Sequence, residues 1–118
     1  MSIVKYLDAV KKHYDSGLAS EHTYRGDLAS LIKSLSPSSH ITNEPSNVTE
    51  CGNPDFVVTR KNVPVGFIEA KDIGKNLDSK LYTEQFARYK KALDNLIITD
   101  YLNFRFFQRG EQVAEIRI

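Results

Sequence analysis

Two β-rich runs joined by a short connection constrain the fold of this chain most strongly. Residues 55–60 and 65–71 are rich in β-branched and aromatic side chains, and residues 61–64 separate them. Apolar residues follow one another in both runs, which is typical of interior strands whose two faces are covered by helices. The sequence therefore predicts a hairpin inside an α/β fold.

Charged residues stand at one end of this predicted hairpin. Asp55 begins the first run, and Glu69 and Lys71 end the second. Side chains two apart on a strand project from the same face, so Glu69 and Lys71 are expected to lie together, with Asp55 brought near by strand pairing. Such charges are costly to desolvate unless a cation or a partner compensates them. A solvated acid–base pair of little energetic weight is the structural alternative.

These residues resemble the signature of the PD-(D/E)XK nuclease superfamily, with Pro54-Asp55 followed by Glu69-x-Lys71. The resemblance implies that Asp55 and Glu69 bind a divalent metal ion, that the backbone carbonyl of Ala70 adds a ligand, and that Lys71 contacts the attacking water. The likeness also implies an α/β fold with a restriction-endonuclease-like core, in which a mixed β-sheet is flanked by α-helices.

A second motif, Gln85-Phe-Ala-Arg-Tyr89, is similar to the Q-x-x-x-Y motif of the RecB-like branch of that superfamily. Gln85 and Tyr89 are four residues apart and share one face of a helix. The resemblance implies that Gln85 holds a water or a DNA backbone group, and that Tyr89 packs and hydrogen bonds near Lys71. On its own, the pair also fits an ordinary amphipathic helix with Tyr89 in the core.

From about Glu21 to the C-terminus, the chain resembles the N-terminal nuclease domain of large single-chain restriction–modification enzymes, of the type I-like or type IIG kind. This likeness implies that residues 1–118 are one nuclease domain excised from a larger enzyme. It also implies double-stranded DNA as the substrate. Its other partners would be a methyltransferase, a target-recognition domain and, in some members, a translocase motor of the same parent chain.

The second predicted helix, residues 19–35, contains a candidate for a third acidic ligand. Superfamily members often take an extra metal ligand from a first-helix glutamate, which makes Glu21 the candidate. An intrahelical ion pair between Glu21 and Arg25, four residues on, is an equally weighted alternative. Glu44 and Glu50 are further candidates, in a stretch without a clear register.

Composition limits the other classes of function. The chain has 16 Lys and Arg against 15 Asp and Glu, a balance that does not indicate DNA binding, although neighbouring domains can supply affinity for phosphate. Cys51 is the single cysteine, and His13, His22 and His40 lack zinc-ligand spacing. No secretory pattern or long apolar run occurs, so a cytoplasmic protein without a membrane partner is expected.

Helices are predicted at residues 3–16 and 19–35, and a third helix, capped by Asp78 or Ser79, is predicted to run to Leu93. Strands are predicted at residues 40–45, 96–99, 103–107 and 113–118. The inward-facing residues are predicted to be Ile3, Leu7, Val10 and Tyr14 in the first helix, Tyr24, Leu28, Leu31, Ile32 and Leu35 in the second, and Leu81, Tyr82, Gln85, Phe86, Tyr89 and Leu93 in the third.

The function predicted from these observations is Mg²⁺-dependent hydrolysis of DNA phosphodiester bonds by an endonuclease, with Mn²⁺ as a substitute. Lys71 would orient or deprotonate the nucleophile. Two alternatives stay open: a non-catalytic DNA-binding or docking module with a degenerate nuclease fold, and a stand-alone nuclease for structured DNA, such as a junction resolvase. One active site cuts one strand at a time, so dimerisation is one route to double-strand cleavage.

Overall fold

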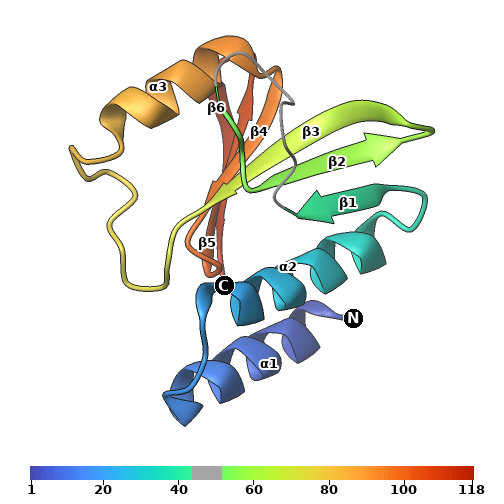
Figure 1. The fold of residues 1–118 in the computed structure, drawn as a ribbon, viewed down its shortest axis with the longest axis vertical. Helices are drawn as coiled ribbons and strands as arrows, with labels where there is room; N and C mark the ends of the chain where they lie inside the picture. Colours follow the sequence, from blue (N-terminus) through green and yellow to red (C-terminus); the bar gives the residue numbers. More distant parts are fainter. Residues whose placement is uncertain (44–51) are drawn as a thin grey trace.

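The computed structural model describes residues 1–43 and 52–118, which form three helices and six strands (Figure 1). In chain order the elements are α1 (Ile3–Ser16), α2 (Glu21–Leu35), β1 (His40–Asn43), β2 (Phe56–Arg60), β3 (Val63–Ala70), α3 (Thr83–Ala92), β4 (Asn95–Thr99), β5 (Asn103–Gln108) and β6 (Glu111–Arg117).

All six strands belong to one sheet, whose order in space follows their order in the chain. β3 and β4 are parallel, and the other neighbouring pairs are antiparallel. The parallel pair is joined through α3, because parallel strands need a crossover connection. Ala70 lies opposite Thr99 in the register, so β3 and β4 end at the same edge of the sheet. The predicted mixed sheet is confirmed.

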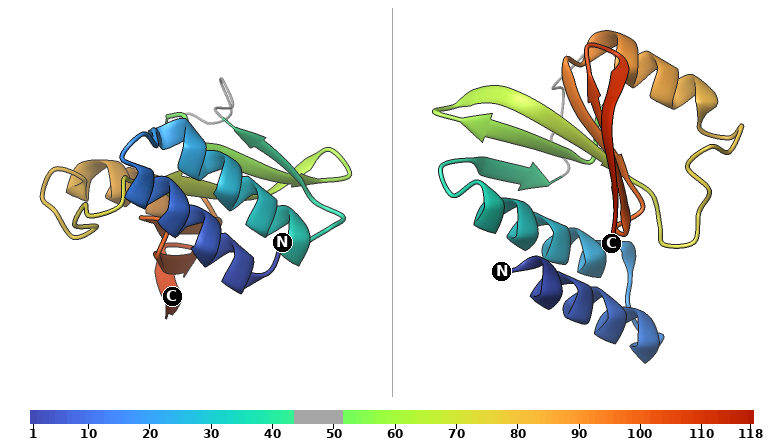
Figure 2. Two further views of the ribbon diagram at one scale, coloured as in Figure 1. Left: turned by 90° about the horizontal axis from the view of Figure 1, so that it is seen from below. Right: turned by 180° about the vertical axis from the view of Figure 1, so that it is seen from behind.

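Helices cover the sheet from two sides. α1 and α2 lie side by side on one face, and α3 lies apart from them (Figure 2). Ile68 packs in the core with α1 and α2, whereas its neighbour Phe67 packs against the core that contains Phe86 of α3. Because side chains alternate along β3, neighbouring residues of this strand pack into two separate apolar cores.

The connection of the β2–β3 hairpin is shorter than predicted. Lys61 and Asn62 alone form the turn, and both have positive φ angles, 52° and 65°, as a two-residue hairpin turn of type I′ requires. Val63 and Pro64 belong to β3 instead. Pro64 lies at a register shift beside Thr59, a place where a strand tolerates the missing N–H group.

The apolar faces predicted for the first two helices are partly wrong. In α1, Tyr6 and Val10 are buried, whereas Ile3 and Tyr14 are exposed. Tyr6 occupies the buried position because its hydroxyl donates a 2.7 Å hydrogen bond to the carbonyl of Tyr101. In α2 the buried stripe stops at Leu31, and Leu35 is exposed at the helix end.

The third helix begins later than predicted, at Thr83, and Leu81 is 87% exposed. Turns occupy the preceding segment, where the Tyr82 N–H bonds the Ser79 carbonyl. The outer half of β3 also differs from the expectation of helices on both faces, because Val63 and Val65 are exposed.

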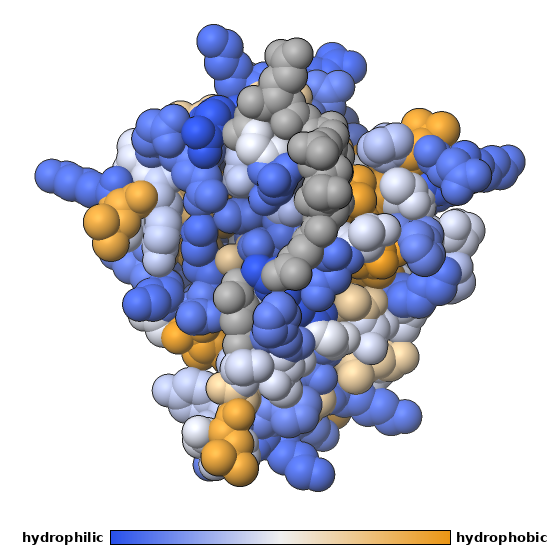
Figure 3. Space-filling view, viewed as in Figure 1, coloured by the Kyte–Doolittle hydropathy of each residue, from blue (hydrophilic) through white to orange (hydrophobic). Residues whose placement is uncertain are grey.

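Across residues 1–43 and 52–118, no helix is both long and apolar enough to cross a membrane. Figure 3 shows one face of the molecule on which hydrophobic residues form small separate groups.

Candidate active site

The charged end of the β2–β3 hairpin forms a hydrogen-bonded cluster. Asp55 immediately precedes β2, and Glu69 and Ala70 are the last residues of β3. The Asp55 backbone N–H donates to Glu69 Oε1 at 3.1 Å, and the Ala70 N–H donates to Asp55 Oδ2 at 2.8 Å. These bonds confirm that strand pairing brings Asp55 to Glu69. They also fix the Ala70 peptide next to the Asp55 carboxylate.

Lys71 joins this cluster to α3. Its ammonium group donates to Glu69 Oε2 at 3.2 Å and to Gln85 Oε1 at 2.9 Å. The same nitrogen lies 4.7 Å from the centre of the Tyr82 ring and 5.8 Å from that of Phe86, within cation–π range. Lys71, the residue after β3, therefore projects to the same side as Glu69, as predicted, and residues of α3 and the turn before it hold the ammonium group.

Tyr89 lies one helical turn beyond Gln85 and is buried in the apolar core beneath α3. Gly52 approaches its ring closely, since a Cβ atom at Gly52 would lie 3.4 Å from the Tyr89 hydroxyl. This packing agrees with a supporting position. The predicted hydrogen bonding of Tyr89 near Lys71 stays a prediction.

Arg25 is the residue of this cluster that sequence reasoning did not assign to the site. It reaches from α2, and its Nη2 atom donates to Asp55 Oδ1 at 2.7 Å. Nη1 donates to Asn43 Oδ1 at 3.2 Å, and only 6% of the Arg25 side chain is exposed. The available signal was its place three residues before buried Leu28, where a charge needs a partner across the fold.

The predicted extra acidic ligands lie beyond what the structure describes. Glu21 is the first residue of α2, and its side chain is not among the described ones. Glu44 and Glu50 lie outside the described residues. A role for any of them as a metal ligand stays a prediction, as does the Glu21–Arg25 pair.

The acidic pair is electrostatically unusual. Burial raises the pKa of Glu69 to about 7, and the negative charge of Asp55 adds to the rise. Lys71 acts in the opposite direction, through its charge and its hydrogen bond, without offsetting the burial. Two carboxylates held this close in a buried place favour any cation that can lie between them.

The cluster suits a hard divalent cation. Within the described residues, no three side chains of His, Cys, Asp or Glu gather as a ligand set, so the two carboxylates of Asp55 and Glu69 are the donors to consider. Mg²⁺ is commonly held by one or two carboxylates, with water and substrate phosphate completing its shell. The donor set, together with the unfavourable closeness of the two acids, fits such an ion.

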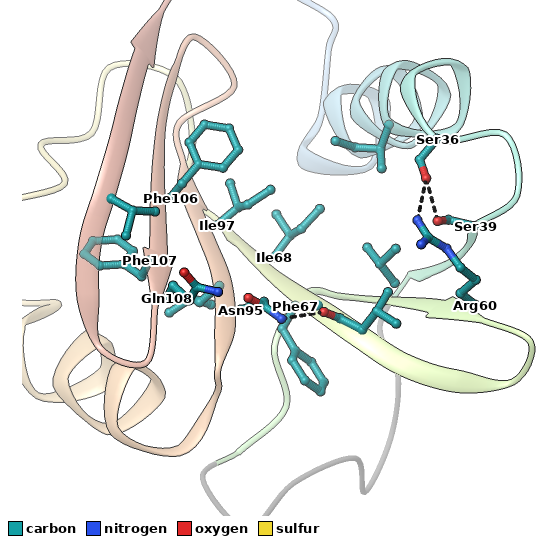
Figure 4. Close-up of a pocket in the computed structure, with 16 residues that line it drawn as sticks. Ser36, Ser39, Arg60, Phe67, Ile68, Asn95, Ile97, Phe106, Phe107 and Gln108 are labelled. Carbon is teal, nitrogen blue, oxygen red and sulfur yellow. Dashed lines mark hydrogen bonds between the residues drawn. The ribbon is translucent and has the colours of Figure 1, made fainter.

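The opposite end of the same strands is mostly apolar. A hollow of about 330 Å³ lies there, between the end of α2 and strands β2 to β6 (Figure 4). Its lining is mostly apolar and contains no Asp or Glu, and its polar contacts include a 3.4 Å bond from Arg60 to Ser36 Oγ. This hollow lacks carboxylate donors for metal-assisted hydrolysis, whereas the charged end has two, and the charged end is therefore the candidate active site.

Comparison with known proteins supports the fold. The structure matches part of a solved DrdV–DNA complex, determined by cryo-electron microscopy, with a TM-score of 0.75 and 22% sequence identity. The match covers 99% of this chain and 12% of that chain. No protein-family model and no curated protein matches the sequence. The predicted fold class, an α/β restriction-endonuclease-like core with a mixed sheet and flanking helices, is confirmed.

Proposed function

We propose that this chain is a metal-dependent DNA endonuclease domain, the nuclease module of a restriction–modification enzyme. The observation that carries the proposal is the meeting of Asp55, Glu69 and Lys71 at one end of the β2–β3 hairpin. A structural likeness to a protein solved with DNA supports the choice of substrate.

Asp55 and Glu69 would hold Mg²⁺, or Mn²⁺ in its place, with the backbone carbonyl of Ala70 as a further donor. When bound, the ion supplies Lewis-acid activation of the phosphate and of a water molecule. The two carboxylates are fixed for this task before any ion arrives, because Glu69 accepts a hydrogen bond from the Asp55 N–H and Asp55 accepts one from the Ala70 N–H. Fixed ligands spare the site a reorganisation during the reaction.

Lys71 would orient the nucleophile and offset the charge that develops on the phosphate. An ammonium group has three donors, and in the described part of the chain two of them go to Glu69 and Gln85. The third can reach a substrate oxygen, since 18% of the side chain is exposed. Gln85 would act by holding this geometry, and Tyr89 by supporting the helix that carries Gln85.

The wider context is part of the proposal. This chain corresponds to 12% of the DrdV chain, which agrees with a module that works beside other domains. Methyltransferase, target-recognition and translocase domains of a parent chain would supply sequence specificity and most of the affinity for double-stranded DNA. The compartment would be the cytoplasm, and pairing of two modules would allow both strands to be cut.

Nicking of supercoiled plasmid by the purified chain, with Mg²⁺, Mn²⁺ or EDTA, tests the proposal against a Lys71→Ala variant prepared in the same way. Metal-dependent nicking that the variant lacks is the expected result. Nicking that persists in EDTA, or that Lys71→Ala retains in full, would contradict it. If both proteins are inactive even when the DNA is tethered to the chain, the non-catalytic module becomes the better account.

A further inference from the structure

Among the described residues of the cluster, Arg25 is the cation that the proposed reaction does not use. Only 5% of the residue is exposed, and its guanidinium bonds Asp55 Oδ1 at 2.7 Å. It also bonds Asn43 and lies 5.9 Å from the centre of the Phe56 ring. A guanidinium is costly to bury, so a buried one is matched to a specific anion. In this chain one such anion is the carboxylate of Asp55, which is also a proposed metal ligand.

The four carboxylate oxygens of the site are already engaged. Asp55 Oδ1 accepts from Arg25 and Oδ2 from the Ala70 N–H, while Glu69 Oε1 accepts from the Asp55 N–H and Oε2 from Lys71. Among the described residues, each acid therefore has one basic partner. Lys71 approaches from the side of α3, and Arg25 from the side of α2. A divalent ion that uses Asp55 must share its carboxylate with a fixed positive charge.

We propose that Arg25 is a positioning residue that holds Asp55 in place while no metal ion is bound, and that it lowers the affinity of the site for divalent cations. The inference rests on the proposed metal-dependent function. The physical reason is direct: a positive charge 2.7 Å from a ligand oxygen repels an arriving dication, and partial burial limits the screening of that repulsion.

A purely structural role for Arg25 gives a different expectation. If the guanidinium only fastened α2 to the sheet, its removal would loosen Asp55, and metal binding would weaken or stay the same. Under the proposal, removal of the charge strengthens metal binding even though the metal-free chain becomes less stable. The direction of the change in affinity therefore separates the two roles.

The experiment is a titration of the purified chain with Mn²⁺ alone, without DNA, followed by calorimetry or by the electron paramagnetic resonance signal of the free ion. Arg25→Met removes the charge, and Arg25→Lys keeps it. Arg60→Met is the matched control, because it removes one positive charge at the opposite end of β2. Asp55→Asn identifies binding that depends on the site.

We expect Arg25→Met to bind Mn²⁺ about tenfold more tightly than the wild type, with Arg25→Lys and Arg60→Met close to the wild type. Asp55→Asn should lose the binding. Equal or weaker binding by Arg25→Met, with binding still lost in Asp55→Asn, overturns the role of Arg25 and leaves the metal site standing. An absence of saturable binding in both the wild type and Arg25→Met overturns the proposed function as well.

A measurement on the wild type covers the case in which Arg25→Met does not fold. The guanidinium N–H signals of Arg25, assigned by their loss in Arg25→Lys, are followed by nuclear magnetic resonance while Mg²⁺ is added. The proposal expects these protons to exchange faster with water as the Asp55 bond is weakened. Unchanged exchange at a Mg²⁺ concentration that saturates the site would overturn it.

Discussion

The two ends of the β2–β3 hairpin differ in the burial and hydrogen bonding of their charged side chains. At the end that holds Asp55 and Glu69, charged side chains are buried or half-buried, and hydrogen bonds join them across α2, the ends of the two strands and α3. At the other end, Arg60 is exposed and makes a 3.4 Å bond to a serine, beside an apolar hollow. The same pair of strands thus carries costly, specific polar contacts at one end only.

This difference locates the chemistry. Buried charges reduce stability unless their geometry is well satisfied, so a cluster of them at a strand end points to a role other than holding the fold together. Beside the apolar hollow at the other end, the charged residue Arg60 is exposed and bonds only a serine hydroxyl among the described residues. An apolar hollow is a usual first choice for a binding site, but this one has no carboxylate in its lining, whereas the charged end has two.

The largest change in stability is expected from Asp55→Ala, which takes away the carboxylate that Arg25 bonds. We expect the free energy of unfolding to fall by about 3 kcal/mol, since the buried Arg25 guanidinium and the Ala70 N–H each lose the acceptor that they bond. Urea denaturation at pH 8 measures the change, with Asp55→Asn as the variant that keeps a hydrogen-bond acceptor. A loss below about 1 kcal/mol would show that the two ends of the hairpin do not differ as described.

The second prediction concerns pH. The pKa of Glu69 is raised to about 7 in the folded chain, mainly by burial. Between its ordinary value near 4.5 and 7, the folded state keeps a proton that the unfolded state has lost, so stability falls as the pH rises. The contribution, up to about 3 kcal/mol, is present in full below pH 4.5 and is lost as the pH passes 7.

Thermal or urea unfolding of the metal-free chain between pH 4.5 and 8 measures this slope. Glu69→Gln should remove it, because the amide does not titrate, whereas a variant at the other end, Arg60→Ala, should keep it. A slope that is the same in the wild type and in Glu69→Gln would mean that Glu69 is not desolvated as the structure shows.

A smaller effect is expected from Gln85→Ala. This variant loses the 2.9 Å bond that holds the Lys71 ammonium group, while Glu69 still holds it from the other side. The rate of plasmid nicking should fall about tenfold without being abolished, the size expected for one hydrogen bond to a charged group. Gln85→Glu keeps an acceptor and should lose less. Full activity in Gln85→Ala would leave Gln85 as a residue of an ordinary packing helix.

The smallest effect belongs to the opposite end of the hairpin. Arg60→Ala removes an exposed charge, and we expect the free energy of unfolding to change by less than about 0.5 kcal/mol, with nicking unchanged. The same denaturation and nicking assays measure both values. A loss of nicking in Arg60→Ala would extend the functional surface over both ends of the strands.

Local rules were enough to predict the hairpin and that Glu69 and Lys71, at and just after the end of β3, project to the same side. The period of two along a strand fixes that side, whatever the rest of the fold does. The approach of Asp55 to Glu69 followed from pairing of the two runs. These parts depend on few residues, close together in the sequence.

Features set by contacts between distant elements were harder to predict. Arg25 joins the site because α2 packs against the strand end, a contact 30 residues away along the chain. Asp78 was a plausible cap for the third helix, but its carboxylate pairs with Arg105 of β5 at 2.7 Å, and α3 begins only at Thr83. In both cases a charged residue forms an ion pair with a residue far away in the sequence, and no local sequence pattern predicts such a pair.

The most direct test of the account is the Mg²⁺-dependent nicking of supercoiled plasmid by Glu69→Gln and Arg60→Ala, side by side with the wild type. Glu69→Gln keeps the size and packing of the side chain but removes the charge of a proposed metal ligand. The account predicts that Arg60→Ala nicks at the wild-type rate and that Glu69→Gln is slower by at least about a thousandfold. Wild-type nicking by Glu69→Gln would contradict it.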